Sequence, residues 1–201
     1  MTSDEVVAAT RTWLEKAVIG LNLCPFARTV HLHDRIRYCV SDAQSPSSLM
    51  QDLMGELRAL EAADPGVCET TLLIHPHVLE DFLDYNGFLA QADEAVAELG
   101  LEGVIQVASF HPQYQFADAG SDDIENYTNR SPFPMLHLLR EASVERAVTT
   151  YPDTTAIYKK NIDTLRRLGH DGWRRLWLED ISPDKVIHRK DAKDAEKTKF
   201  E

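Results

Sequence analysis

The sequence predicts an α/β protein: a small three-layer fold with a short, mostly parallel sheet of about three strands and additional helices at both ends. Strand-length apolar runs alternate with amphipathic helical segments between residues 35 and 110. Two of these runs, 70–74 and 104–110, are uninterrupted, which is typical of parallel strands covered on both faces. Both runs lead into a His-Pro pair, and this hints at a repeated strand–helix unit.

A helix and a strand are predicted at the start of the chain. Thr2 and Glu5 form a candidate capping box, and apolar side chains then recur at helical spacing to about Gly20. Pro25 separates this helix from the next segment, because proline does not fit a helix interior. Residues 35–40 alternate apolar and polar side chains, which is the pattern of a half-buried strand.

Two helices alternate with the two apolar strands. The pair Ser45-Pro46 marks the start of the first helix, with serine as the cap and proline at the first helical position. The second helix covers 79–99 and ends at Gly100. Because each helix joins one strand to the next, right-handed crossovers and parallel pairing are expected. Further helices are predicted near 134–148 and 154–168.

Length and charge limit the class of protein. A chain of 201 residues suits one domain, expected over 1–182, and residues 183–201 form a charged tail that we expect to be mobile. The net charge of −12, from 21 basic and 33 acidic residues, disfavours binding to nucleic acid or to an anionic membrane. We therefore expect neither partner.

The compartment is predicted from what the sequence lacks. No run approaches the ~20 apolar residues of a membrane span, and the acidic N-terminal segment has no signal-peptide pattern. The three cysteines have unrelated spacings, which does not suggest a disulfide framework. We expect a soluble, cytoplasmic protein with reduced thiols.

A long polar loop follows the strand at 104–110. Loops of about twenty residues are uncommon in compact domains unless they are functional or disordered. This one carries aromatic and proline residues that disfavour disorder, namely Pro112, Tyr114, Phe116, Tyr127 and Pro132. We predict an ordered loop that contributes to a functional site.

His111 lies where this loop begins. Ligands of parallel sheets bind beyond the carboxyl ends of the strands, and both His75 and His111 occupy that position. For His75 the simpler interpretation, a cap at the strand end, is favoured. For His111 a functional role is favoured, because the polar loop starts there.

Cys24 is a candidate reactive thiol. It precedes Pro25, so it would cap a short helix whose free N–H groups face the sulfur and lower its pKa. The alternative is a small apolar residue buried in a turn. The sequence does not decide between the two. Cys39 and Cys68 show no comparable environment, and we predict that they are structural.

His137 and Glu141 are four residues apart and would share one face of the helix predicted at 134–148. Such a pair can bind a metal or act as acid and base, but more often it is a surface ion pair. Together with His111, the two residues would complete a two-histidine, one-carboxylate ligand set for zinc or iron.

The segment TNRSPFP predicts an anion site. Arg130 offers a planar fork suited to carboxylate or phosphate, and Arg140 could join it from the following helix. Asn126, Asn129 and Ser131 could add donors around it. The alternative is a loop held together by its own side-chain bonds to backbone.

Three segments carry a resemblance to a known family: NLCPFA (22–27), ASFHPQYQFA (108–117) and NYTNRSPFPMLHLLREAS (126–143). Together they resemble a bacterial family of uncharacterised proteins, domain of unknown function fourteen-fifteen. The resemblance implies a stand-alone cytosolic protein of about this size and implies no reaction. Its signatures fall on Cys24, on His111 with Tyr114, and on Asn126 through Glu141.

The leading hypothesis is an enzyme that acts on a small anionic metabolite. Cys24 would be its nucleophile or redox-active thiolate and His111 its general base, with His137 and Glu141 completing the catalytic set. This hypothesis requires Cys24 and His111 to face one cavity. The predicted substrate-binding residues are Asn22, Tyr114, Asn126, Thr128, Asn129, Arg130, Ser131 and Arg140.

Two alternatives remain. One is a metalloenzyme with His111, His137 and Glu141 as ligands, and with Cys24 as a possible fourth. The other is a non-catalytic module that senses a ligand or binds a partner. The sequence assigns no cofactor, substrate or oligomeric state.

Overall fold

The structure is a computed structural model that describes residues 1–150 and 154–177. The chain divides into two compact units, Met1–Arg166 and Arg167–Glu201. The predicted tail at 183–201 lies outside the described residues, and the single domain expected over 1–182 stays a prediction. Within the described ranges, no helix combines the length and apolar character needed to cross a membrane.

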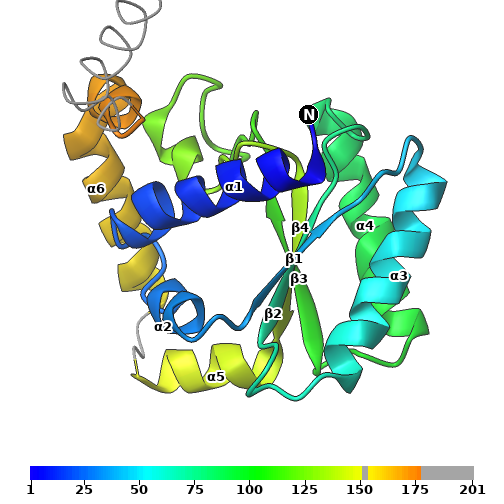
Figure 1. Cartoon of the computed structure of the whole chain (residues 1–201). Helices are drawn as coiled ribbons and strands as arrows, with labels where there is room; N and C mark the ends of the chain where they lie inside the picture. The colour runs from blue at the N-terminus through cyan, green and yellow to red at the C-terminus, as the bar shows by residue number, and fades with distance from the viewer. Residues whose placement is uncertain (151–153, 178–201) are drawn as a thin grey trace, which may run out of the picture. The chain divides into compact units, whose positions relative to one another are not determined.

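The first unit contains a four-stranded mixed sheet (Figure 1). Its strands are β1 (Ile36–Val40), β2 (Thr70–Ile74), β4 (Met135–Arg140) and β3 (Ile105–Phe110), in this spatial order. β1 and β2 are parallel, and β4 is antiparallel to both β2 and β3. The α/β architecture is confirmed. The expected mostly parallel sheet of three strands is wrong, since the sheet has four strands and only one of its pairings is parallel.

β4 occupies a segment that was predicted from sequence to be part of a helix at 134–148. β4 pairs with β2 on one edge and with β3 on the other. Its alternate side chains point to opposite faces, with Leu136 and Leu138 on one and His137 and Leu139 on the other. A short apolar run of this kind fits a central strand as well as a buried helix, so periodicity alone does not separate them. The helix starts only at Glu141, as α5 (Glu141–Thr150). His137 and Glu141 therefore do not share a helix face.

The other elements agree closely with the sequence signals. The capping box of Thr2 and Glu5 opens α1 (Ser3–Trp13), and Ser45 caps α3 (Pro46–Ala62), which has Pro46 at its first position. The remaining described helices are the π-helix η1 (Leu14–Ile19), α2 (Ala27–Leu32), α4 (Phe82–Glu98), the 3₁₀ helix η2 (Ile124–Thr128) and α6 (Thr154–Arg175), whose backbone is interrupted at Gly169.

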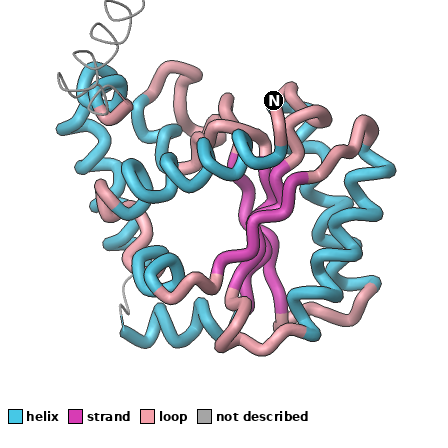
Figure 2. The backbone as a smooth tube through the Cα atoms, viewed as in Figure 1, coloured by secondary structure: helices cyan, strands magenta, loops and turns pink. Residues whose placement is uncertain are grey.

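The two faces of the sheet are covered differently (Figures 1 and 2). α3 and α4 lie against one face of the sheet and form a closed apolar core with it. The core includes Leu49, Leu53 and Leu57 of α3, Phe88 of α4, Leu73 of β2, and Leu136 and Leu138 of β4. α1, η1, α2 and α5 lie on the other face. Because successive strand residues point to opposite faces, the neighbours of the core residues, such as Leu72 and His137, point toward this second group of helices.

Arg140, at the end of β4, links the sheet to α3. Its side chain is largely buried, and its guanidinium donates to the carbonyls of Leu60, Ala63 (2.6 Å) and Cys68 (3.4 Å). Two of these carbonyls belong to the C-terminal end of α3, where carbonyl groups lack helix partners and a cation is favoured. Arg140 is therefore a structural cap and does not join Arg130.

Replacing Arg140 by Met should lower the free energy of unfolding by about 3 kcal/mol, because several buried carbonyls lose their donor. Arg37→Met is the matched control, since Arg37 is half-exposed and pairs with Glu56 at the surface. Its cost should stay below about 1 kcal/mol. Urea unfolding of both variants measures the two values, and equal losses would contradict the capping role.

Candidate functional site

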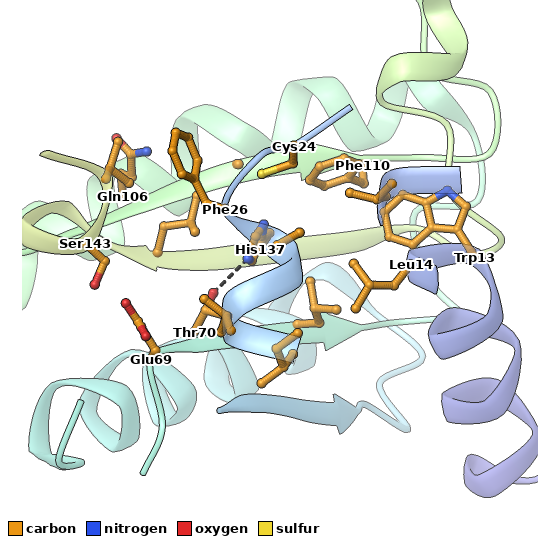
Figure 3. A pocket seen from close by; sticks show the side chains of 18 residues that line it. Trp13, Leu14, Cys24, Phe26, Glu69, Thr70, Gln106, Phe110, His137 and Ser143 are labelled. Carbon is orange, nitrogen blue, oxygen red and sulfur yellow. Dashed lines mark hydrogen bonds between the residues drawn. The ribbon is translucent and has the colours of Figure 1, made fainter. Parts of the chain in front are cut away.

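A cavity of about 300 Å³ lies between the sheet and the helices of the α1 side (Figure 3). Its floor consists of strand residues from all four strands: Ile36, Thr70, Leu72, Gln106, Ala108, Phe110, His137 and Leu139. Its walls and roof are Trp13, Leu14, Val18, Cys24, Phe26, Ala27, Val30, Glu69, Ser143 and Val144. The lining is mostly apolar, with a few polar groups at defined places.

His137 stands in the middle of the cavity floor. In the sheet register it lies between Leu72 of β2 and Ala108 of β3, so apolar residues flank it on both sides. The Phe110 ring lies with its centroid 6.0 Å from the imidazole. Burial lowers the pKa of His137 to about 4. The imidazole is therefore neutral at neutral pH.

A short chain of hydrogen bonds fixes the His137 ring. Its Nε2 lies 2.7 Å from the Thr70 hydroxyl oxygen, and the Thr70 hydroxyl donates to the Leu138 carbonyl at 2.6 Å. Figure 3 shows the second ring nitrogen pointing away from Thr70, toward the side of the cavity where Cys24 lies. Thr70 thus orients an imidazole that presents Nδ1 to the cavity.

Cys24 lines the cavity from the segment that precedes α2. Burial raises the pKa of its thiol, and backbone N–H groups of Phe26 and Ala27 oppose that shift without overcoming it. The N–H groups predicted to face the sulfur are therefore present, but the predicted lowering of the pKa is wrong because desolvation of the thiolate is the larger effect. The resting side chain is a neutral thiol.

The roof segment that carries Cys24 is fixed on the side that precedes the cysteine. Gly20 follows the π-helix, and a Cβ there would lie 2.2 Å from the Lys16 carbonyl oxygen, so only glycine fits this turn. The carbonyl of Leu23 accepts from the Asn161 side chain of α6 at 2.8 Å. Asn22, predicted to bind substrate, is exposed and adopts a φ of 53° in this turn instead of lining the cavity.

The two ends of the cavity differ in polarity. Glu69, Gln106 and Ser143 lie together at one end, and Trp13 and Leu14 lie at the other (Figure 3). The Glu69 carboxylate pairs with Arg35 at 3.5 Å and with Arg146 at 3.3 Å. The charge at this end is thus balanced by arginines outside the cavity lining, and the opposite end is apolar.

His111 lies on the other side of the sheet. Phe110 points into the cavity, so the next residue faces away from it, where the His111 ring contacts Phe82 (5.4 Å) and Tyr85 (5.0 Å). The ring is fully buried, with Nδ1 accepting from the Gln113 N–H at 3.0 Å and Nε2 lying 3.2 Å from the Leu79 carbonyl. The site that was predicted to join Cys24 and His111 is therefore not formed.

His75 and His111, which lie at two strand ends, both contact the Tyr85 ring. The His75 ring stacks on Tyr85 with centroids 5.8 Å apart, and Tyr85 also contacts His111. Both histidines are fully buried, and burial lowers the pKa of His75 to about 4. They belong to the core beside α4 and not to an open crevice.

The polar loop is held together by its own bonds. The buried Asn126 side chain accepts from the Phe116 N–H and donates to the Gly120 carbonyl. The Asn129 side chain donates to the Ser109 carbonyl, and the Ser131 hydroxyl donates to the Phe133 carbonyl. These contacts match the alternative interpretation of the segment, in which its side chains bond to backbone.

Arg130 belongs to the same network. Its guanidinium donates to the carbonyls of Tyr114 (3.1 Å) and Ser121 (2.6 Å) and stacks on the Tyr127 ring at 4.5 Å. Thr128 has a buried hydroxyl without a partner among the described residues. The segment after Pro132 leads into strand β4 and not into a helix, and Arg140 at the end of that strand bonds to α3, so the predicted anion site lacks Arg140.

The alternative metal site is not assembled either. His137 and His111 lie on opposite faces of the sheet, and Glu141 begins α5. Within the part of the chain that the structure describes, no group of three or more His, Cys, Asp or Glu side chains is arranged to hold a metal ion.

Of the residues predicted to be catalytic, Cys24 and His137 line one cavity, whereas His111 and Glu141 do not. Thr70, Trp13 and Phe110 also line it and were not predicted from sequence. The alternation of Gln106, Ala108 and Phe110 along β3 is a signal that could have revealed part of the lining, because it places these three residues on one face of the sheet.

The family model described as "Protein of unknown function (DUF1415)" matches residues 5–175. All three segments on which the resemblance rested lie within this range. No match was found among curated proteins or among solved structures.

Acid should destabilise the fold in a way that depends on His137. A histidine with a pKa of about 4 in the fold and an ordinary value of ~6.5 when unfolded stabilises the protein above pH 6.5 and loses this contribution as the pH falls toward 4. The loss amounts to about 3 kcal/mol over that window. His137→Gln should reduce the measured drop by this amount in urea titrations, whereas the cavity control Val144→Ala should retain it. An equal loss of unfolding free energy on acidification in His137→Gln and in the wild type would contradict the burial argument.

The Cys24 thiol should react slowly. In a Cys39→Ala/Cys68→Ala background, iodoacetamide should modify native Cys24 at pH 7 roughly ten times more slowly than the urea-unfolded chain, because burial disfavours the thiolate. The rate should rise as the pH is raised. Rapid modification at pH 7 would show an activated thiolate and would favour the predicted enzyme.

Proposed function

The chain belongs to the family of proteins of unknown function DUF1415, and from its own cavity we propose that it binds a small, uncharged, mainly apolar organic molecule. The observation that carries this proposal is the lining of the cavity. Apolar side chains from the sheet, α1, η1 and α2 surround a few polar groups, which is the usual composition of a small-molecule site.

The size of the cavity limits the ligand. A volume of about 300 Å³ is roughly twice the ~150 Å³ of an engineered cavity that accommodates benzene, so one or two rings fit. Elongated molecules of several rings would require the roof to move.

The charge of the cavity also limits the ligand. Among the described residues that line it, none is Lys or Arg, and the one carboxylate, Glu69, is paired with arginines. A buried anion would lose its hydration without gaining a cation. This supports a neutral ligand over the anionic metabolite predicted from sequence, whose expected anchors Arg130 and Arg140 bond elsewhere.

Catalysis by Cys24 is a second candidate, favoured by the position of Cys24 and His137 in one cavity. The pKa of the thiol is above its ordinary value and that of the imidazole is about 4, so the proton stays on sulfur in the resting protein. A thiolate–imidazolium pair would therefore have to form only in the presence of substrate. The enzyme hypothesis stays a prediction that the alkylation experiment addresses.

Blocking the cavity should abolish binding. 2-Naphthol, a neutral two-ring probe, should bind the wild-type protein in isothermal titration calorimetry, and Ala108→Phe should weaken it at least about tenfold by filling the cavity floor beside His137. Ala97→Phe is the matched control, because Ala97 is exposed on α4. Binding that survives Ala108→Phe, or is lost equally in both variants, would contradict the proposed site.

A further inference from the structure

We propose that the bound molecule donates a hydrogen bond to Nδ1 of His137, so that the cavity selects ligands with a neutral hydroxyl or N–H group. This inference rests on the proposed function and specifies its ligand class. It would make His137 and Thr70 the residues that determine specificity, with Thr70 acting through the imidazole as a positioning residue.

The single hydrogen of the Thr70 hydroxyl determines the tautomer of His137. The hydroxyl oxygen lies 2.6 Å from the Leu138 carbonyl oxygen and 2.7 Å from Nε2 of His137. Two oxygens at such a distance need a hydrogen between them, and a carbonyl cannot supply it. The Thr70 hydrogen therefore points to Leu138. Nε2 of His137 must be the donor to Thr70, so it carries the imidazole hydrogen.

Nδ1 of His137 is consequently an acceptor. A neutral imidazole with its hydrogen on Nε2 has a lone pair on Nδ1, which can only accept. No hydrogen-bond partner of Nδ1 is found among the residues that the structure describes. Figure 3 shows this nitrogen on the cavity side of the ring. The cavity therefore presents a fixed acceptor in an apolar surrounding.

Ligand classes differ in how they meet this acceptor. A hydroxyl or N–H group completes the hydrogen bonding of Nδ1. An ether, ketone or carboxylate places its own lone pairs against Nδ1, and a hydrocarbon leaves Nδ1 without a partner. The thiol of Cys24 is the other polar group on this part of the lining, but thiols are weak donors and weak acceptors. Selection therefore depends mainly on His137.

The test compares 2-naphthol, 2-methoxynaphthalene and naphthalene by calorimetry. We expect 2-naphthol to bind at least about tenfold more tightly than the other two, the effect of about one hydrogen bond. Equal binding of all three would overturn the inference and leave the proposed function intact. Absence of binding by all three would overturn the proposed function as well.

Two variants separate specificity from folding. Thr70→Val removes the acceptor for Nε2, which frees the imidazole to carry its hydrogen on either nitrogen, so the preference for 2-naphthol should fall below about threefold. Thr71→Val is the control, since Thr71 lies one residue further along the strand and its buried hydroxyl has no partner among the described residues. It should keep the full preference. An unchanged preference in Thr70→Val would overturn the role of Thr70.

The tautomer can also be observed without a ligand. In long-range ¹H–¹⁵N spectra of ¹⁵N-histidine protein, His137 should show a protonated Nε2 and an unprotonated Nδ1 at pH 7, with assignment from the His137→Gln variant. A hydrogen on Nδ1 would overturn the inference directly, because the cavity would then present a donor.

Discussion

The position of β4 between β2 and β3 is the constraint on which the rest of this structure depends. It pairs on both edges and is covered on both faces, so alternate residues must satisfy two different environments. Leu136 and Leu138 complete the closed core with α3 and α4. His137, which lies between them in sequence, points into the cavity on the opposite face of the sheet. Arg140 then ties the end of the same strand to α3.

Three arginines of the described chain serve the architecture. Arg140 caps a helix, Arg130 holds a loop by its backbone carbonyls, and Arg35 neutralises a carboxylate at the edge of the cavity. None of these three arginines lines the cavity, and no Lys or Arg is found among its described lining residues. The sheet face beneath that cavity carries only uncharged polar side chains, Thr70, Gln106 and the neutral His137, among apolar residues. This composition favours uncharged ligands.

Much of the fold could be predicted from local sequence signals, but the site only in part. Helix caps and apolar strands depend on residues that are close together in the sequence, so they can be recognised from one sequence. This applies to the caps at Thr2 and Ser45 and to the strands at 70–74 and 105–110. The sequence predicts a helix where β4 lies, because a short apolar run fits both structures. A helix at this position would place His137 beside Glu141. The hydrogen bond between His137 and Thr70 depends on the pairing of β4 with β2, which joins residues far apart in the chain and cannot be predicted from local sequence.

The π-helix between Leu14 and Ile19 has a consequence for how the cavity can vary. A wider turn is equivalent to one additional residue in an otherwise regular helix, so it changes the rotational phase of every later side chain. Leu14 reaches the cavity at the start of this turn, and Val18 reaches it in the altered phase. The contour of the roof is thus encoded by helical register as well as by side-chain identity, and the loss of a single residue here would reshape the binding space without altering any residue that lines it.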